Sequence, residues 1–407
     1  MTPIPITIVG STGSIGRSTL AVVDRYADRL RVVGLAAHSN AKLLAEQVAR
    51  YKPEIVGLSD KRGEAALREG VGDWSGPIVI GDAAMTEVAS HPSAQTAVIA
   101  VVGFAGVRPT LAAIGAGHKI ALANKETLVT AGEPVMAAAR SKGVDIVPID
   151  SEHSAVWQCL RAGRHEEVRR IILTASGGPF RQRPLATFDT ITPDDALAHP
   201  TWKMGPRITI DSATMMNKGF EIIEAARLFG MGSDQIDVVI HPQSIVHSMV
   251  EFRDGSTMAQ LGATDMTLPI AYALFAPERP PAADGMPLLD VTALSRLDFD
   301  APDVERFPAL GLARQALETG GTTPAVLNAA DEMAVAAFLD GYLPFTGIPT
   351  MVSDALREHP VVSDPNVEDI EQADDWARTY VNRRLAETYT DSGASASTPG
   401  PSRAESQ

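Results

Sequence analysis

The chain has 407 residues, of which 45% are hydrophobic and 21% are charged, as expected of a soluble globular protein with a full core. Its net charge of -15 argues against nucleic-acid binding through a basic surface, although a local basic pocket for a small anion remains compatible with it. The single cysteine excludes an intrachain disulfide, and neither a signal peptide nor an apolar run of the ~20 residues that span a membrane is evident, so we expect a cytoplasmic protein without a membrane partner.

The first third of the chain alternates between short β-rich runs and segments with helical apolar spacing. This alternation predicts an α/β fold, a Rossmann-like doubly wound domain over residues 1–149. The expected strands are 4–9, 31–37, 54–58, 77–80, 96–102, 119–123 and 145–149, and the expected helices are 14–26, 41–51, 83–90, 107–116 and 134–142.

The pattern changes after residue 149. Residues 150–275 predict a central α+β catalytic domain with a partly antiparallel sheet, in which a short segment at 208–210 precedes a helix from about 214 to 229. A helix at 154–161 would bury Cys159 as an unreactive thiol. Proline-rich residues 276–306 are typical of a linker, 307–387 predict a C-terminal helical bundle, and 388–407 have the composition of a disordered tail.

A glycine-rich segment, Gly10-Ser11-Thr12-Gly13-Ser14-Ile15-Gly16, follows the first strand and opens a helix. Glycines let a pyrophosphate approach closely, and the helix N-terminus supplies N–H donors, so a dinucleotide site is predicted. The spacing differs from Gly-x-Gly-x-x-Gly, and a plain strand-to-helix turn is the alternative.

The second predicted strand ends at His38-Ser39-Asn40 without the carboxylate that usually binds the ribose of NAD. NADP is therefore favoured over NAD, although an ordinary polar loop would have the same composition.

Two acidic segments lie far apart in the sequence, one containing Asp150 and Glu152 and the other Glu221. If the fold brings these carboxylates together, two unit charges ~4 Å apart cost about 4 kcal/mol at an effective dielectric of ~20. Such a group needs raised pKa values or a bound cation, and all-oxygen ligands favour Mg²⁺ or Mn²⁺. Solvated loop and helix-end residues are the alternative.

Two further segments lie between these acids. Ser176 belongs to a glycine turn that could form an anion-binding nest, and His199 begins a loop in which Trp202 and Met204 could form a lid. An ordinary surface loop held by one tryptophan is the alternative for the second segment.

These motifs together resemble the 1-deoxy-D-xylulose 5-phosphate reductoisomerase family over residues 4 to about 387. The segments that carry the resemblance are 10–16, 122–126, 150–153, 175–180, 199–205, 212–221, 241–247 and 328–332.

The resemblance implies a homodimeric, cytoplasmic oxidoreductase of the non-mevalonate (MEP) isoprenoid pathway. It would convert 1-deoxy-D-xylulose 5-phosphate to 2-C-methyl-D-erythritol 4-phosphate with NADPH and Mg²⁺, Mn²⁺ or Co²⁺.

The resemblance also implies roles for individual residues. Cofactor contacts would come from Thr12, Gly13, Ser14, Ile15, His38, Ser39, Asn40, Asn124, Glu126 and Gly205, and metal ligands would be Asp150, Glu152 and Glu221. Substrate contacts would come from Lys125, Ser151, Glu152, Ser176, His199, Trp202, Met204, Ser212, Asn217, Lys218 and Glu221, of which Lys125, Glu152, His199 and Glu221 would be catalytic.

One departure concerns the 2′-phosphate region, where a fixed cation that the family often has is missing from His38-Ser39-Asn40. Two alternatives also stay open: a related NADP-dependent oxidoreductase with another small substrate, and an NADP-sensing regulator with vestigial carboxylates. His241 and His247 are interpreted as packing or interface residues rather than a second metal site.

Overall fold

The computed structural model describes residues 2–202 and 204–391. These residues form two compact units. The first combines 1–127 with 133–165 and 259–291, and the second combines 128–132 with 166–258 and the chain from 292 onward. Lys203, which lies between Trp202 and Met204, and residues 392–407 of the predicted tail lie outside the described residues.

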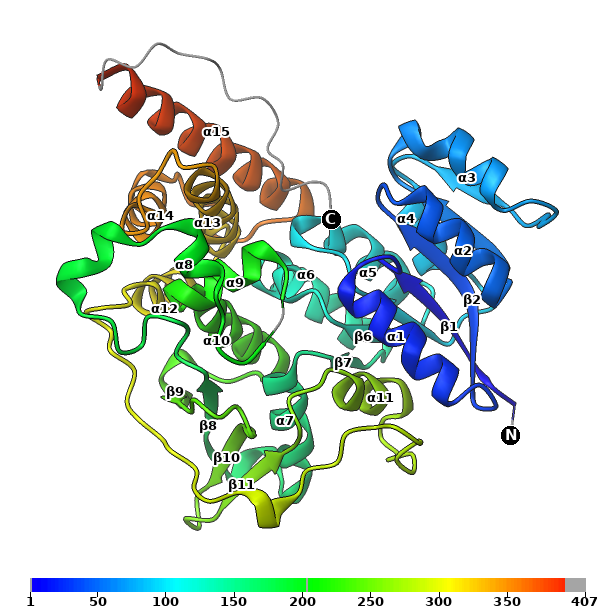
Figure 1. The fold of residues 1–407 in the computed structure, drawn as a ribbon, viewed down its shortest axis with the longest axis horizontal. Helices are drawn as coiled ribbons and strands as arrows, with labels where there is room; N and C mark the ends of the chain where they lie inside the picture. Colours follow the sequence, from blue (N-terminus) through cyan, green and yellow to red (C-terminus); the bar gives the residue numbers. More distant parts are fainter. Residues whose placement is uncertain (1, 203, 392–407) are drawn as a thin grey trace. The chain divides into compact units, whose positions relative to one another are not determined.

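A seven-stranded parallel sheet forms the centre of the first unit (Figure 1). Its order is β4-β3-β2-β1-β5-β6-β7, so the chain moves outward from β1 to β4 and then returns to the other side of β1. Ligands bind at such a reversal in open α/β sheets, beyond the carboxyl ends of the strands. The strands are β1 (Ile4–Val9), β2 (Leu30–Ala37), β3 (Ile55–Leu58), β4 (Ile78–Ile80), β5 (Thr96–Ile99), β6 (Lys119–Leu122) and β7 (Ile146–Pro148).

Helices cover both faces of this sheet, as a doubly wound fold requires. On one face an apolar core joins the strands to α1, α2, α3 and α11, and on the other α4 packs so closely that a Cβ at Gly57 would lie 2.6 Å from the Ala84 carbonyl oxygen. The helices are α1 (Ser14–Arg25), α2 (Ala41–Tyr51), α3 (Glu64–Gly70), α4 (Ala84–Ala89), α5 (Val107–Gly115), α6 (Lys125–Lys142), α7 (Ser151–Cys159) and α11 (Thr267–Phe275). The predicted α/β class is confirmed.

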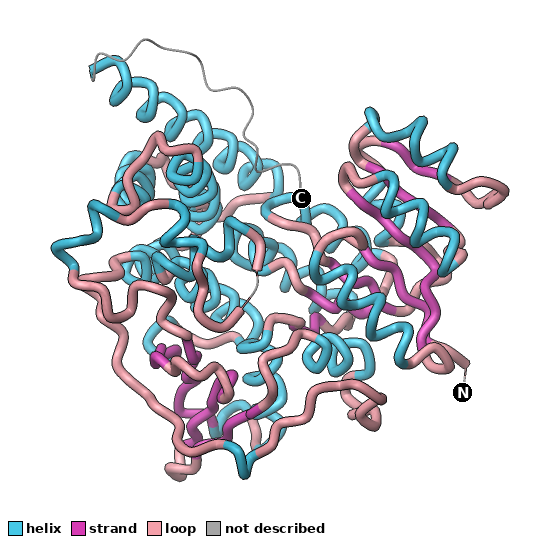
Figure 2. The backbone as a smooth tube through the Cα atoms, viewed as in Figure 1, coloured by secondary structure: helices cyan, strands magenta, loops and turns pink. Residues whose placement is uncertain are grey.

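The second unit contains a mixed four-stranded sheet with the order β11-β10-β8-β9, drawn with the other strands in Figure 2. β8 pairs antiparallel with β10 and parallel with β9, which confirms the predicted partly antiparallel sheet. The strands are β8 (Val168–Ala175), β9 (Ile236–Ile240), β10 (Val246–Phe252) and β11 (Thr257–Leu261).

Helices make up the rest of the second unit. Buried phenylalanines join its loops to its helices, and the rings of Phe180 and Phe345 meet edge to face with centroids 5.2 Å apart. The helices are α8 (Pro193–Leu197), α9 (Pro206–Thr214), α10 (Met216–Phe229), α12 (Ala309–Thr319), α13 (Thr323–Leu339), α14 (Gly347–Glu358) and α15 (Val367–Asp391).

The segment before α10 differs from the prediction. Residues 208–210 are helical and belong to α9, although two of them are β-branched isoleucines. Pro206 begins that helix after Gly205, and the Thr209 hydroxyl donates to the Gly205 carbonyl at 2.7 Å. Met215, with φ of 66°, then separates α9 from α10, so the helix predicted from about 214 begins at Met216.

Three other helices of the first unit differ from the prediction, among them α3, for which no helix was predicted. α6 begins at Lys125 rather than at 134, because a kink at Ala131 accommodates the internal Pro134. α11 was missed because it is short, apolar on all sides and contains Pro269, which hides a helical period.

The predicted domain boundaries remain a prediction, and the compact units follow other limits. Residues 150–165 and 259–291 lie in the first unit, while the predicted helical bundle lies in the second with the mixed sheet. Residues 388–391, assigned to the tail, belong to α15. Among the described residues, no helix has both the length and the apolar character needed to cross a bilayer.

Candidate functional site

The glycine loop between β1 and α1 contains glycines of two kinds. Gly10 has φ of 91°, and a Cβ there would lie 2.4 Å from the Ala100 carbonyl oxygen; one at Gly16 would lie 2.2 Å from the Gly10 oxygen. A Cβ at Gly13 would meet nothing closer than 3.4 Å. The first two glycines are therefore needed for close packing, whereas Gly13 leaves open surface where a ligand can approach.

The N-terminus of α1 is suited to an anion. Its N-cap, Gly13, offers no side-chain hydrogen bond, and Thr12, Ser14 and Ile15 around it are exposed or half-buried. The Ser11 hydroxyl points away and donates to Gln47 on α2 at 2.7 Å, which fixes the loop. The first-turn N–H groups are thus directed at the end of the sheet where its strand order reverses.

The end of β2 exposes all three predicted 2′-phosphate contacts, His38, Ser39 and Asn40. The Asn40 side-chain oxygen is already used, since it accepts from the Leu43 amide at 3.1 Å and caps α2. The Asp60 amide donates to the His38 carbonyl at 2.8 Å and so places the loop after β3 beside them.

This loop supplies a cation that sequence reasoning missed. Arg62, whose side chain is 87% exposed, pairs with Asp60 at 2.8 Å, and its hydrogen bond lowers the pKa of Asp60. The available signal was the position of Lys61 and Arg62 just after β3, the neighbour of β2 in the sheet.

Asn124 and Glu126 brace the loop that follows β5. The Asn124 amide donates to the carbonyls of Val101 and Gly103 at 3.1 and 3.0 Å, and Glu126 accepts from the Gly103 amide at 3.1 Å. Asn124 is only 1% exposed. Their observed role is to shape this loop, and their direct contact with a cofactor remains a prediction.

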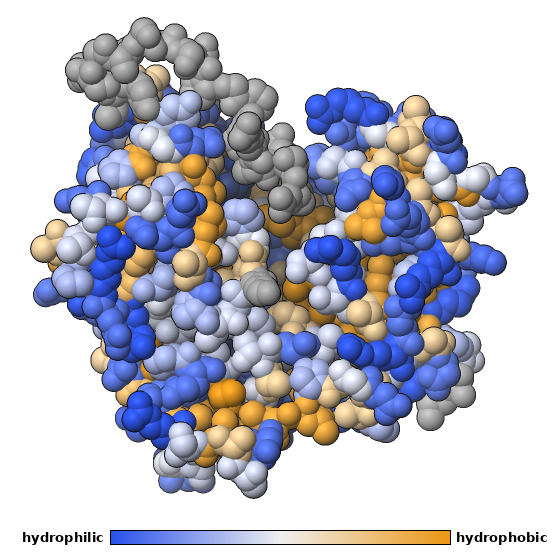
Figure 3. Space-filling view, in the orientation of Figure 1, coloured by the Kyte–Doolittle hydropathy of each residue, from blue (hydrophilic) through white to orange (hydrophobic). Residues whose placement is uncertain are grey.

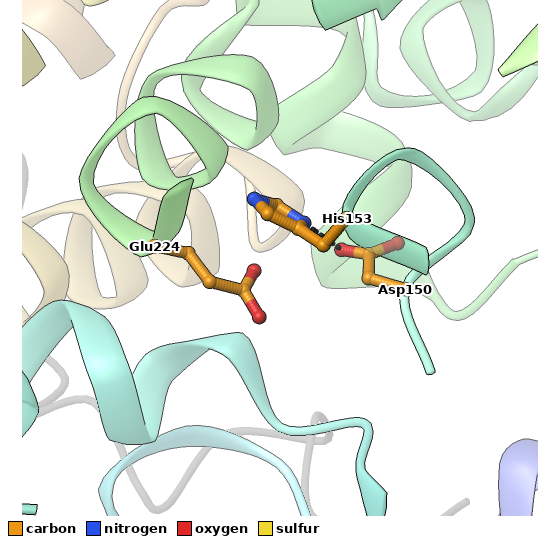
Figure 4. A group of neighbouring side chains, drawn as sticks. All are labelled: Asp150, His153 and Glu224. Carbon is orange, nitrogen blue, oxygen red and sulfur yellow. Dashed lines mark ion pairs between the residues drawn. The ribbon is translucent and has the colours of Figure 1, made fainter. Parts of the chain in front are cut away.

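The carboxyl ends of β6 and β7 bring Lys125 and Asp150 together. The Lys125 Nζ lies 2.6 Å from Asp150 Oδ2, and Asp150 Oδ1 accepts from the Ser151 amide at 3.1 Å, capping α7. The Ser151 hydroxyl donates to Glu152 at 2.5 Å. Figure 4 shows buried His153 beside Asp150, with Nδ1 4.0 Å from Oδ2.

In the second unit, His199 connects two of the predicted phosphate-binding serines. Its Nε2 lies 3.1 Å from the hydroxyl oxygens of both Ser176 and Ser212. A Cβ at Gly178, which has φ of 65°, would lie 2.6 Å from the Ser212 carbonyl oxygen, so glycine is needed for this close approach.

The tautomer of His199 follows from its other nitrogen. Nδ1 accepts from the backbone N–H groups of Thr201 and Trp202 at 3.2 and 3.0 Å. Since Nδ1 carries no proton there, the neutral ring bears its proton on Nε2, facing the serines. Burial lowers the pKa of His199 and favours this neutral form.

Asn217, Lys218 and Glu221 form a second cluster at the start of α10. The Asn217 amide donates to Glu221 Oε1 at 2.6 Å, and Lys218 forms an ion pair with Glu221 Oε2. Lys218 is 3% exposed and Glu221 is fully buried, so each charge is compensated inside the protein. The helical spacing predicted from the sequence is confirmed here.

The remaining predicted residues lie on the segment that leads into α9. Trp202 and Met204 are half-buried, and exposed Gly205 is the N-cap of the helix. Asp150 and Glu152 belong to the first unit and Glu221 to the second. The three-carboxylate metal site is therefore a proposal, taken up below.

Two of the sequence interpretations concern packing residues. Cys159 is buried, and burial raises the pKa of its thiol to about 11, as expected of an unreactive residue. His241 is fully buried, with Nδ1 2.8 Å from the Asp298 carbonyl oxygen and Nε2 accepting from the amides of Ile245 and Val246. Both of its ring nitrogens are engaged, as a packing role requires.

The fold and these clusters define a class of protein: a dinucleotide-dependent oxidoreductase for an oxygen-rich, anionic substrate. The family model of 1-deoxy-D-xylulose 5-phosphate reductoisomerase matches residues 6–132. The model of the reductoisomerase C-terminal domain matches residues 146–229, and a second C-terminal domain model of the same enzyme matches residues 261–380.

Relatives and solved structures of that description cover nearly the whole chain. The reductoisomerases of Heliobacterium modesticaldum and Pelotomaculum thermopropionicum are each 53% identical, over 94% and 92% of this chain and 97% and 96% of their own length. The structure of the Zymomonas mobilis enzyme in complex with NADPH has a TM-score of 0.88 at 43% identity and covers 94% of this chain and 99% of its own. A reductoisomerase in complex with NADPH, fosmidomycin and magnesium has a TM-score of 0.89 at 39% identity, covering 95% and 99%.

The chain belongs to the 1-deoxy-D-xylulose 5-phosphate reductoisomerase family. The resemblance predicted from the motifs is thereby confirmed.

Proposed function

We propose that this protein converts 1-deoxy-D-xylulose 5-phosphate to 2-C-methyl-D-erythritol 4-phosphate, using NADPH and a divalent cation. The observation that carries the proposal is the family agreement over 94% of the chain, which includes both polar clusters and the glycine loop. The alternative oxidoreductase and the regulator are disfavoured, because every residue that the predicted chemistry needs is present.

The first unit would bind NADPH at the reversal of strand order. Thr12, Gly13, Ser14 and Ile15 would hold the pyrophosphate at the open N-terminus of α1. His38, Ser39 and Asn40 would surround the 2′-phosphate, and Arg62 would supply the missing cation by exchanging Asp60 for phosphate. Asn124, Glu126 and Gly205 would contact the rest of the cofactor.

Asp150, Glu152 and Glu221 would hold the cation, Mg²⁺ or Mn²⁺, with Co²⁺ also possible for this donor set. The residues fit such an ion because carboxylate oxygens are its preferred ligands. Two of these carboxylates are now compensated by lysines, Asp150 by Lys125 and Glu221 by Lys218. When bound, the cation supplies Lewis-acid polarisation of a carbonyl oxygen, and NADPH supplies a hydride.

The second unit would bind the phosphate of the substrate. Ser176, Ser212, Asn217 and Lys218 offer hydroxyl, amide and ammonium donors within one unit. Neutral His199 holds its Nε2 proton toward the serines and would donate to a substrate oxygen in their place. Remote phosphate binding would orient the reacting carbons.

Lys125 and Ser151 would contact the substrate backbone from the carboxyl ends of β6 and β7, and Trp202 and Met204 would exclude water as a lid. The Lys125 ammonium, now beside Asp150, would stabilise negative charge on a substrate oxygen.

The proposal is tested by following NADPH absorbance with 1-deoxy-D-xylulose 5-phosphate, with and without Mn²⁺ or Mg²⁺. We expect oxidation only when sugar phosphate and metal are both present. Oxidation that ignores either one, or none at all, would defeat the proposal. NADH in place of NADPH tests the cofactor preference in the same assay.

A cytoplasmic homodimer is proposed as the working form. Figure 3 shows hydrophobic residues gathered at the lower edge of the view, over the region of β10 and β11, and Met258 on the edge strand β11 is 41% exposed. An exposed edge strand is a common site of pairing between chains. Light scattering of the purified protein would check this, and a monomer at assay concentration would exclude it.

A further inference from the structure

Two buried aspartates lie beside each other on α9 and α13 of the second unit. Neither helix carries a predicted catalytic acid. Asp211 on α9 is 4% exposed and Asp331 on α13 is fully buried. Asp211 directly precedes Ser212, whose hydroxyl lies 3.1 Å from His199 Nε2. The contact between the aspartates is therefore next to the proposed phosphate site.

The two helices that carry this pair, together with α15, also hold a network of arginines and acids. α9 contributes Arg207, which donates to Asn328 Oδ1 at 2.8 Å and to Glu332 at 3.1 Å, both on α13. α15 contributes Arg378, which pairs with Asp374 at 2.6 Å and with Glu332 at 3.1 Å. Arg207 also lies 3.7 Å from Asp211 Oδ2, so among the described residues each arginine is shared between two acids: Arg207 between Asp211 and Glu332, and Arg378 between Asp374 and Glu332.

The hydrogen-bonding pattern points to a retained proton. Among the described residues, no N–H or hydroxyl group donates to either carboxyl oxygen of Asp331; the Asp211 carboxyl lies within hydrogen-bonding reach of it, and Arg207 and Glu332 are its other charged neighbours. A buried carboxylate without donors is costly, whereas a protonated carboxyl can donate to its neighbour. Burial first, and then the negative charge of Asp211, raise the pKa of Asp331 well above its ordinary value.

We propose that Asp331 and Asp211 share one proton, and that this acid pair clamps α9 to α13 and thereby positions Ser212. Asp331 is thus a positioning residue, because it acts on the substrate phosphate only through Asp211 and the helix. The effect on Ser212 rests on the proposed function, whereas the shared proton does not.

The direction of the pH effect follows from linkage. Because the pKa of Asp331 is raised in the folded protein, its stabilisation is present below the ordinary aspartate pKa and is lost as the pH rises through the raised value. Above that value two ionised carboxylates would repel each other, and α9 would separate from α13.

Asp331→Asn tests the proposal because an amide of the same shape donates to Asp211 at every pH. We would measure KM for 1-deoxy-D-xylulose 5-phosphate and kcat from about pH 5 to about pH 9, at saturating NADPH and Mn²⁺. In the wild type KM should rise by up to about tenfold per pH unit above the pKa of the pair. In the variant this rise should be absent, and NADPH affinity should be unchanged. Parallel KM profiles for the two proteins would overturn the positioning role.

Asp374→Asn is the matched control, since Asp374 belongs to the same network but pairs with Arg378 on its own helix. Burial raises the pKa of Asp374 as well, so this variant separates the loss of any buried acid from the loss of the acid beside Asp211, and it should keep the wild-type dependence of KM on pH.

Thermal unfolding across the same pH range tests the shared proton without any substrate. The Tm of the wild type should fall relative to that of Asp331→Asn as the pH rises. A difference in Tm that stays constant across the pH range would overturn the shared proton. If neither protein turns over the sugar phosphate at any pH, the proposed function fails, and the unfolding curves still decide whether the proton is shared.

Discussion

The two compact units hold their polar groups in different ways. In the first, the groups around the glycine loop lie at open strand ends: Gly13 has space beside it, and Arg62 pairs with Asp60 at the surface. In the second, Lys218 and Glu221 are buried and paired with each other, and half-buried His199 lies beside two half-buried serines.

This difference bears on how each unit would meet a ligand. A dinucleotide can approach the first unit with small side-chain movements, because backbone N–H groups at a helix end are already exposed. A ligand of the second unit must replace internal partners, since breaking a buried pair without replacement leaves an uncompensated charge. Three substitutions and one chemical modification would break or sharpen this contrast, and their effects should decrease in the order given.

The largest effect should come from Glu221→Gln. Substituting a residue that only hydrogen-bonds to a metal ligand typically lowers metal affinity or activity about 10- to 100-fold. Loss of a proposed ligand itself should therefore lower kcat at least about 100-fold. NADPH binding, measured by fluorescence titration, should survive. The exposed Glu318→Gln is the control for loss of one charge. Near-normal turnover in Glu221→Gln would remove this residue from the metal site.

Lys218→Ala should act mainly on substrate affinity. A hydrogen bond to a charged group contributes about 1.5–3 kcal/mol, which corresponds to a rise in KM of about 10- to 100-fold. Because Lys218 also compensates Glu221, the Mn²⁺ dependence should be measured in the same variant. The exposed Lys142→Ala serves as control, and a fall in kcat at constant KM would contradict the phosphate role.

Arg62→Ala should have a smaller effect because the side chain is 87% exposed. An exposed ion pair contributes up to about 1 kcal/mol, so KM for NADPH should rise about fivefold while that for NADH stays constant. Arg68→Ala is the control: it removes another surface charge, 53% exposed, that pairs with Glu64 on α3. Equal effects on both cofactors would mean that Arg62 does not read the 2′-phosphate.

Alkylation of Cys159 should have almost no effect. The thiol is buried and its pKa is raised to about 11, so little thiolate exists at neutral pH. Activity after treatment of the native protein with iodoacetamide should match that of an untreated sample. Rapid inactivation that Cys159→Ala abolishes would show that this thiol is reachable after all.

Features that depend on local chemistry were predictable from the sequence. The glycine loop follows a strand and begins a helix, and the spacing of Asn217 and Glu221 places both on one helix face. The family resemblance could be recognised from the sequence because its motifs are long and uninterrupted, and the family models and relatives confirm it.

Features set by tertiary contacts were not predictable. Residues 208–210 contain β-branched side chains, yet they are helical because Pro206 and Gly205 begin α9 there. Arg62 is 22 residues beyond Asn40 in sequence, and only the pairing of β2 with β3 brings its loop near. The Asp211–Asp331 contact likewise needs the packing of α9 on α13, which no local pattern encodes.

The carbon skeleton of the product distinguishes a reductoisomerase from a simple reductase. The purified protein would be incubated with 1-deoxy-D-xylulose 5-phosphate, NADPH and Mn²⁺, and the product examined by carbon NMR. We expect the branched 2-C-methyl-D-erythritol 4-phosphate in an amount equal to the NADPH oxidised. An unbranched sugar alcohol phosphate would contradict it, because the protein would then be a simple reductase.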